Sequence, residues 1–142
     1  MGCDIHAHLE IKVKDEWMYY APAYIERWYD LFAYMADVRN YNEVEPISRP
    51  RGLPSDITQM TVLHRQEDGP DGYSDSWLSY PEICKAVDWV LEHQDMAPEE
   101  RWRWRCQSFG IWLFGSTIRD WAEYPDSYPD YLEDIRLVFW FD

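Results

Sequence analysis

Four side chains that can bind a metal ion stand at every second position near the start of the chain. They are Asp4, His6, His8 and Glu10. On a strand, side chains two residues apart point to one face and lie about 6.5–7 Å apart. We therefore expect His6 and His8 to share one Zn²⁺ or Mn²⁺ ion, with Asp4 as a further ligand. His64, His93 or a distant carboxylate must complete the site, and the loop acids Asp68, Asp71 and Asp75 are candidates.

A bound ion at this strand would support hydrolysis, because it lowers the pKa of a coordinated water to about 7. Asp4 and Glu10 are the candidates for the general base that accepts the proton of this water. Arg49 and Arg51 lie on a proline-containing loop and are the candidates for binding a substrate phosphate. Two alternatives stay open. The acidic and histidine row could be a solvated polar face, and the two arginines could pair with internal carboxylates.

The composition limits the classes of partner. The chain has 142 residues and a formal net charge of -14, which should repel the phosphate backbone of nucleic acids. Its 9 Trp and 11 Tyr residues favour a packed core over disorder, and the length suits one globular domain over residues 1–142. No apolar run approaches the roughly 20 residues of a membrane helix. Three widely spaced cysteines and the lack of a signal pattern indicate a cytoplasmic protein with reduced thiols.

Hydrophobic periodicity predicts strands at both ends of the chain. Apolar and polar residues alternate over residues 3–13, and a shorter run at 17–20 would complete an N-terminal hairpin. Residues 135–142 predict a final strand, central in the sheet because both of its faces are largely apolar. A short strand is also expected at 61–64.

Helical patterns occupy three stretches, at 27–38, after Ser79 and from Pro98 towards residue 123. Ser79 and Glu82 have the spacing of a capping box, which marks the start of the second helix. Loops are expected over 39–58 and 68–76, where proline, glycine and aspartate are frequent. The fold class that follows is α+β: a small antiparallel sheet of the hairpin and the C-terminal strand, packed on one face against about three helices.

Two resemblances bear on function. The segment Cys3-Asp4-Ile5-His6-Ala7-His8 resembles the Asp-x-His-x-His strand of amidohydrolases and PHP-type phosphoesterases, which implies a catalytic metal at a strand end. The opening Met-Gly-Cys-Asp-Ile-His is similar to that of small uncharacterised bacteriophage proteins. The similarity extends to residues 29–40, 51–54 and 76–78 and to the closing aromatic strand. It implies a phage protein in the cytoplasm of an infected bacterium, with no activity carried over.

The sequence therefore predicts a metal-dependent hydrolase, and more specifically a phosphoesterase that acts on a nucleotide or nucleotide signal in phage counter-defence. One alternative is a nucleotide-sequestering protein without catalysis, in which Trp and Tyr rings stack on a base and Arg side chains bind its phosphates. Another is an acidic DNA mimic that inhibits a basic host protein. The many tryptophans would also suit an aromatic homodimer interface.

Overall fold

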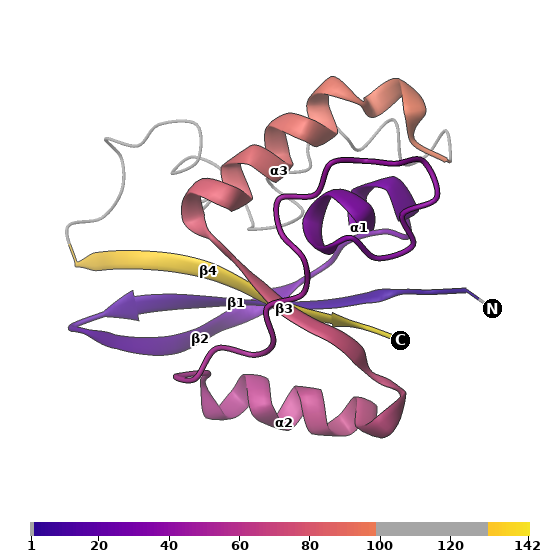
Figure 1. The fold of residues 1–142 in the computed structure, drawn as a ribbon. Helices are drawn as coiled ribbons and strands as arrows, with labels where there is room; N and C mark the ends of the chain where they lie inside the picture. The colour runs from indigo at the N-terminus through magenta and orange to yellow at the C-terminus, as the bar shows by residue number, and fades with distance from the viewer. Residues whose placement is uncertain (1, 99–130) are drawn as a thin grey trace.

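The computed structural model describes residues 2–98 and 131–142, which form one antiparallel sheet and its covering helices (Figure 1). In chain order the elements are β1 (Ile5–Val13), β2 (Glu16–Ala23), α1 (Tyr29–Ala36), α2 (Gln59–Asp68), a 3-10 turn (Gly69–Asp71), β3 (Tyr73–Ser79), α3 (Tyr80–Glu92), a second 3-10 turn (Gln94–Met96) and β4 (Leu132–Phe141). The helical region predicted after Pro98 lies outside the described residues.

The sheet has four strands in the order β2-β1-β4-β3, and every neighbouring pair is antiparallel. The α+β class, the N-terminal hairpin and the C-terminal strand are thus confirmed. β4 is an inner strand, as its two apolar faces predict, and its residues 135–141 are all buried. Pairing of β1 with β4 brings the two ends of the described chain together, so residues 4–6 lie beside residues 140–142.

A two-residue turn closes the hairpin of β1 and β2. Lys14 and Asp15 both have positive φ, 51° and 64°, which is the backbone of a type I′ turn and matches the twist of the strands. The amide of Asp15 donates a hydrogen bond to Glu133 just inside β4 (2.9 Å). The turn therefore fixes the register that places alternate residues of β1 on opposite faces.

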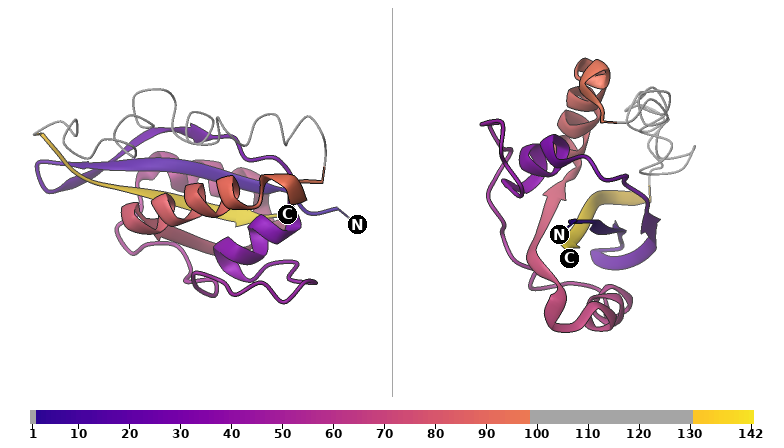
Figure 2. Two further views of the ribbon diagram at one scale, coloured as in Figure 1. Left: turned by 90° about the horizontal axis from the view of Figure 1, so that it is seen from above. Right: turned by 90° about the vertical axis from the view of Figure 1, so that its right-hand side faces the viewer.

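The apolar face of the sheet packs against α1 and α3, which both lie on one side of it (Figure 2). β1 contributes Ile5, Ala7 and Leu9 to this core, all of them buried. From α1, the ring of Phe32 lies 5.2 Å from that of Phe141 on β4. Burial of these side chains supplies most of the drive to form this layer, at about 1.5–3 kcal/mol for each large side chain.

α2 covers the opposite face of the sheet, so the expectation that all helices lie on one face is wrong (Figure 1). The reason lies in β4, whose second face carries Val138 and Trp140 and cannot stay in water. α2 supplies the cover: the ring of His64 stacks on that of His8 from β1 at 4.5 Å. His8 and Glu10, the middle of the polar row, are consequently enclosed between sheet and helix.

Two local predictions are also wrong. Residues 61–64 belong to α2, which begins after Thr58, whose hydroxyl accepts a hydrogen bond from the Thr61 amide. Residues 73–76, expected to be a loop, begin the edge strand β3. The polar composition of this segment gives no hydrophobic pattern from which a strand could be predicted. The capping box of α3 is confirmed, since Ser79 and Glu82 form both of its reciprocal bonds. Among the described residues, no helix combines the length and apolarity needed to span a membrane.

Candidate metal centre

The candidate site lies on the α2 side of the sheet, at the end where β1 begins and β4 finishes. Strand pairing places His6 opposite Trp140, and backbone hydrogen bonds of 3.1 Å in both directions join Asp4 to Asp142. α2 packs against this face of the strands and ends at Asp68. Three elements distant in sequence therefore meet at one corner of the fold.

His6, Asp68 and Asp142 form a cluster with metal-ligating potential. One ligand atom from each lies within 4.8 Å of the other two. Nε2 of His6 is 2.9 Å from Oδ1 of Asp142, and Nδ1 is 3.8 Å from Oδ2 of Asp68. Atoms that share one zinc ion at 2.0–2.1 Å are separated by roughly 3–3.5 Å. The two distances involve different nitrogens of the ring, and 4.8 Å is wider than this spacing, so one bound ion would draw the three side chains closer together.

The hydrogen bonding of His6 distinguishes this cluster from an ordinary ion pair. Its Nε2 atom is buried and forms no hydrogen bond among the described residues, although Asp142 is close. A buried, unpaired polar atom costs about 1–3 kcal/mol, and a bound cation would satisfy it. One imidazole and two carboxylates suit Zn²⁺ or Mn²⁺, and three protein ligands leave positions for water or substrate.

Asp68 is held in place by its neighbour on β4. The indole N–H of Trp140 donates a hydrogen bond to Oδ2 of Asp68. Trp140 is itself fully buried, and the guanidinium of Arg65 lies 5.8 Å from the centre of its ring. Arg65 in turn bonds Asp75 and the carbonyls of Gly69 and Gly72, which fixes the chain just beyond Asp68.

His8 and His64, both predicted as ligands, stack on each other instead of converging on an ion. Their ring centres are 4.5 Å apart with an interplanar angle of 20°. His8 also hydrogen bonds through Nδ1 to the hydroxyl of Tyr19 (2.9 Å) and stacks on Trp140. Burial and the nearby imidazoles of His64 and His6 lower the pKa of His8 to about 4. His8 is therefore neutral at physiological pH.

Asp4 lies beside the cluster and pairs with Arg27. Nε of Arg27 donates to Oδ1 of Asp4 (2.8 Å), and this bond lowers the pKa of the Asp4 carboxyl. Both side chains are about half exposed. The guanidinium packs closely over Gly2, where an added Cβ would lie 2.2 Å from Nη1. Arg27 was not singled out from the sequence, yet it is a half-exposed cation bonded to Asp4.

Glu10, predicted as a general base, is completely buried and engaged on both oxygens. Oε1 accepts from Arg136 (2.7 Å), and Oε2 accepts from the hydroxyls of Thr58 (2.5 Å) and Thr61 (2.7 Å). Arg136 also bonds Asp56 (2.6 Å). These contacts tie β1 to β4 and to the start of α2. The arrangement therefore gives Glu10 a structural role.

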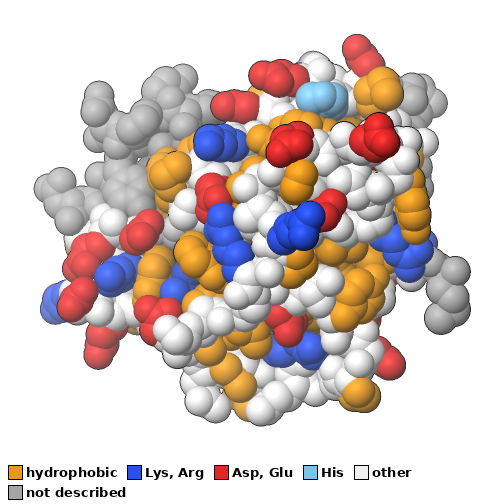
Figure 3. Space-filling model, viewed as in Figure 1, with side chains coloured by type: hydrophobic (Ala, Val, Ile, Leu, Met, Phe, Trp, Pro, Cys, Tyr) orange, Lys and Arg blue, Asp and Glu red, His pale blue; other side chains and the backbone are white. Residues whose placement is uncertain are grey.

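The structure does not bring Arg49 and Arg51 to the cluster. Arg51 forms a bidentate pair with Glu82 (2.7 and 2.5 Å) and bonds the carbonyl of Trp77. Arg49 is 87% exposed and lies 4.0 Å from Asp37. Acidic and basic side chains are interspersed over the face shown in Figure 3. Arg51 thus follows the alternative reading, in which arginines pair with internal carboxylates.

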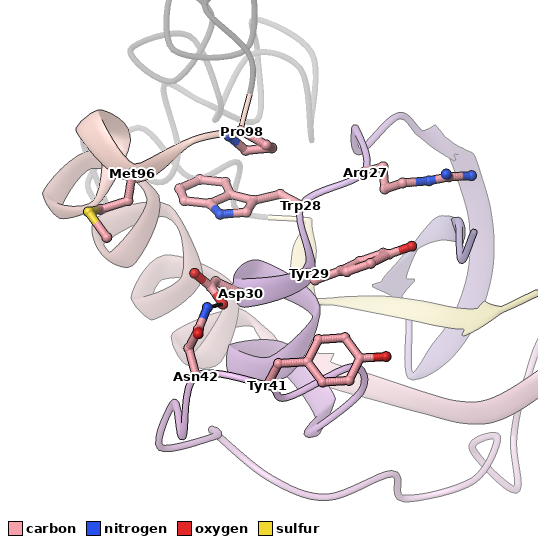
Figure 4. A pocket seen from close by; sticks show the side chains of 8 residues that line it. All are labelled: Arg27, Trp28, Tyr29, Asp30, Tyr41, Asn42, Met96 and Pro98. Carbon is pink, nitrogen blue, oxygen red and sulfur yellow. Dashed lines mark hydrogen bonds between the residues drawn. The ribbon is translucent and has the colours of Figure 1, made fainter. Parts of the chain in front are cut away.

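A separate pocket of about 370 Å³ lies on the α1 side of the sheet. Figure 4 shows Trp28 next to Met96 and Pro98, with Tyr29 and Tyr41 pointing away from them and Arg27 at the far edge. It contains none of the residues predicted as metal ligands. Its aromatic rings and its guanidinium are nevertheless the groups that bind a nucleotide base and phosphate.

Comparison of the chain with protein-family models, with curated proteins and with solved structures found no significant match.

Proposed function

We propose that this chain is a divalent-metal-dependent hydrolase of phosphoesters whose ion is bound by His6, Asp68 and Asp142. The observation that carries the proposal is the buried Nε2 atom of His6, which forms no hydrogen bond among the described residues and lies close to carboxylates from two other elements. This set replaces the predicted one of His6, His8, Asp4 and His64, of which only His6 is retained.

The surroundings of the cluster suit chemistry on an anionic substrate. A divalent ion at this position would polarise a phosphoryl oxygen and activate water. Asp4 is ionised beside the cluster, and its bond from Arg27 lowers its pKa, so it would act only as a weak base. Arg27 is next to it and half exposed, and it takes over the phosphate-binding role predicted for Arg49 and Arg51.

The substrate class in the proposal is a nucleotide or nucleotide signal. Its support is the resemblance of the opening strand to phosphoesterase strands and of the chain to bacteriophage proteins. Removal of a host signal in the cytoplasm of an infected bacterium would then be the biological role. The absence of a spanning helix in the described residues agrees with this setting.

Metal content and hydrolysis, measured on the same tag-free protein, test the proposal. We expect near-stoichiometric Zn²⁺ or Mn²⁺ by mass spectrometry and hydrolysis of bis(p-nitrophenyl) phosphate or of members of a nucleotide panel. His6→Ala, Asp68→Asn and Asp142→Asn should each abolish metal binding and hydrolysis. Asp71→Asn is the matched control, because this exposed carboxylate lies near Asp68 but outside the cluster. Retention of metal and activity in the three variants would contradict the proposal.

Nucleotide sequestration without catalysis is the second candidate, and the pocket of Trp28, Tyr29, Tyr41 and Arg27 favours it. In that case nucleotides should bind in the presence of EDTA, be recovered unchanged, and lose affinity in Tyr41→Ala. Tyr41 is 67% exposed, so this variant should fold normally. Binding that requires the metal and survives Tyr41→Ala would exclude this candidate.

A further inference from the structure

A second cleft lies on the α2 side of the sheet, at the end opposite the candidate metal centre. It has a volume of about 540 Å³, and its walls are Trp17 on β2 and Trp77 on β3. The floor is β4 around Asp134 and Arg136, and the loop at Ser55 borders it. We call it the Trp17–Trp77 cleft. Along β1, the six residue steps from His6 to Lys12, the partner of Trp17, span about 20 Å, and no residue of the metal cluster lines the cleft, so the two sites are separate.

Both tryptophan rings are held by guanidinium groups. Arg136 lies 3.9 Å from the centre of the Trp17 ring, and Arg51 lies 4.8 Å from that of Trp77. Each arginine is fixed by carboxylates, Arg136 by Glu10 and Arg51 by Glu82. The aromatic walls are thus ordered before any ligand arrives, which reduces the entropic cost of binding.

The same contacts exclude an anionic ligand. Arg136 donates hydrogen bonds from Nε to Glu10 and from its terminal nitrogens to the side chain and carbonyl of Asp56. Arg51 donates hydrogen bonds from its terminal nitrogens to Glu82 and to the carbonyl of Trp77. Their charges are therefore neutralised inside the protein. A phosphate entering the cleft would find donors that are already committed and carboxylates that repel it.

Hydrogen-bond acceptors remain available in the cleft. Of the Asp134 carboxylate, only Oδ1 accepts a described bond, from the Ile135 amide. Asp56 accepts from Arg136 through Oδ1 and is 61% exposed. A matching ligand must offer N–H donors to these oxygens and a flat surface to an indole and a guanidinium.

We propose that the Trp17–Trp77 cleft binds a flat, uncharged heteroaromatic ring that carries N–H donors, the chemistry of an amino-purine base. The ring stacks between Trp77 and the Arg136–Trp17 pair, and its N–H groups face Asp134 and Asp56. Base–aromatic stacking supplies affinity, and the carboxylates select for donors. The volume lies in the range of small-molecule sites.

Fluorine NMR of protein labelled with 5-fluorotryptophan tests the proposal, with guanosine as the probe and EDTA present. Guanosine has no phosphate and EDTA removes any ion, so the result is independent of the proposed hydrolase. The resonances are assigned from Trp17→Phe and Trp77→Phe. We expect guanosine to shift the signals of Trp17 and Trp77. Shifts confined to tryptophan signals other than those of Trp17 and Trp77, or no shifts at 1 mM guanosine, would overturn the proposal.

Variants and a second nucleoside separate stacking from donor recognition. Trp77→Ala should weaken guanosine binding about 5- to 150-fold, the range for losing one stacked ring. Asp134→Ala, at an exposed position, should weaken it about 10-fold, while Tyr41→Ala in the other pocket should leave it unchanged. Purine riboside, which lacks the N1–H and the amino group, should bind at least 10-fold more weakly. Equal binding of the two nucleosides would contradict the role of the carboxylates.

Discussion

Nε2 of His6 lies 2.9 Å from Oδ1 of Asp142, although the two residues are separated by almost the whole chain. The antiparallel pairing of β1 with β4 creates this proximity, since it sets His6 opposite Trp140 and Asp4 opposite Asp142. Asp68 arrives independently, at the end of the helix that covers this face. Formation of the candidate centre therefore requires the pairing of β1 with β4 and the packing of α2, and it should appear only in the folded chain.

Trp140→Phe tests whether the indole N–H positions Asp68 for an ion. The variant keeps an aromatic ring in the core but removes the donor to Oδ2 of Asp68. We expect the affinity for Zn²⁺ or Mn²⁺ to fall about 10- to 100-fold, the usual effect of losing a partner that orients a ligand. Isothermal titration calorimetry measures it. Trp89→Phe, on α3 and away from the cluster, is the control, and an equal loss there would point to general destabilisation.

Glu10→Gln separates a structural role from catalysis. Glu10 is fully buried against Arg136, so the neutral amide should lower the free energy of unfolding by about 3 kcal/mol. Urea unfolding followed by circular dichroism measures the change. The exposed Glu16→Gln should stay within about 0.5 kcal/mol of the wild type. If Glu10→Gln were as stable as the wild type but inactive, the predicted general-base role would be right after all.

Most strands and helices could be predicted from the sequence, because their signals are local. The alternation over residues 3–13, the capping box at Ser79 and the apolar faces of residues 135–142 each specify an element without reference to the rest of the chain. β3 could not be found this way. Its Ser-Asp-Ser segment is polar, and Ser74 has a positive φ of 54° beside a register irregularity in the pairing with β4.

The candidate site was only half predictable, for a physical reason. His6 belongs to a periodic strand, so its exposure to the polar face follows from the sequence. Its partners depend on which strand pairs with β1 and on which helix covers that face, and both are tertiary properties. One signal was present: an aspartate comes just before the first strand and another just after the last, and antiparallel pairing of these strands would join Asp4 with Asp142. Asp68 was a candidate among the loop acids but could not be chosen over Asp71 or Asp75.

Arg51→Gln and Arg49→Gln form a matched pair that tests whether each arginine stabilises the fold or binds the substrate phosphate. The guanidinium of Arg51 lowers the pKa of Glu82 to about 2 through its hydrogen bonds. Its loss should cost about 1–2 kcal/mol in urea unfolding. Arg49 is exposed, so its substitution should cost less than about 0.5 kcal/mol. Neither should raise the KM for a phosphoester, and a rise in both would restore them as phosphate-binding residues.

The stacked histidines make stability depend on pH, and His8→Phe isolates that dependence. In the folded chain His8 takes up a proton only near pH 4, because of burial and the imidazoles of His64 and His6, whereas in the unfolded chain it does so near 6.5. Between these values the unfolded state holds more protons, so the contribution of His8 is complete above pH 6.5 and declines as the pH falls towards 4. The loss amounts to about 3 kcal/mol.

His8→Phe keeps a ring in the stack with His64 and Trp140 but cannot titrate. Urea unfolding of both proteins at pH 7.5, 6.5, 5.5 and 4.5 should therefore show the wild type losing more stability than the variant over this range. Carboxylates whose pKa is lowered by arginines, such as Asp4 and Asp56, add their own acid sensitivity in both proteins and cancel in the difference. Parallel pH profiles would mean that His8 is solvated in the folded chain, and its enclosure under α2 would then be in error.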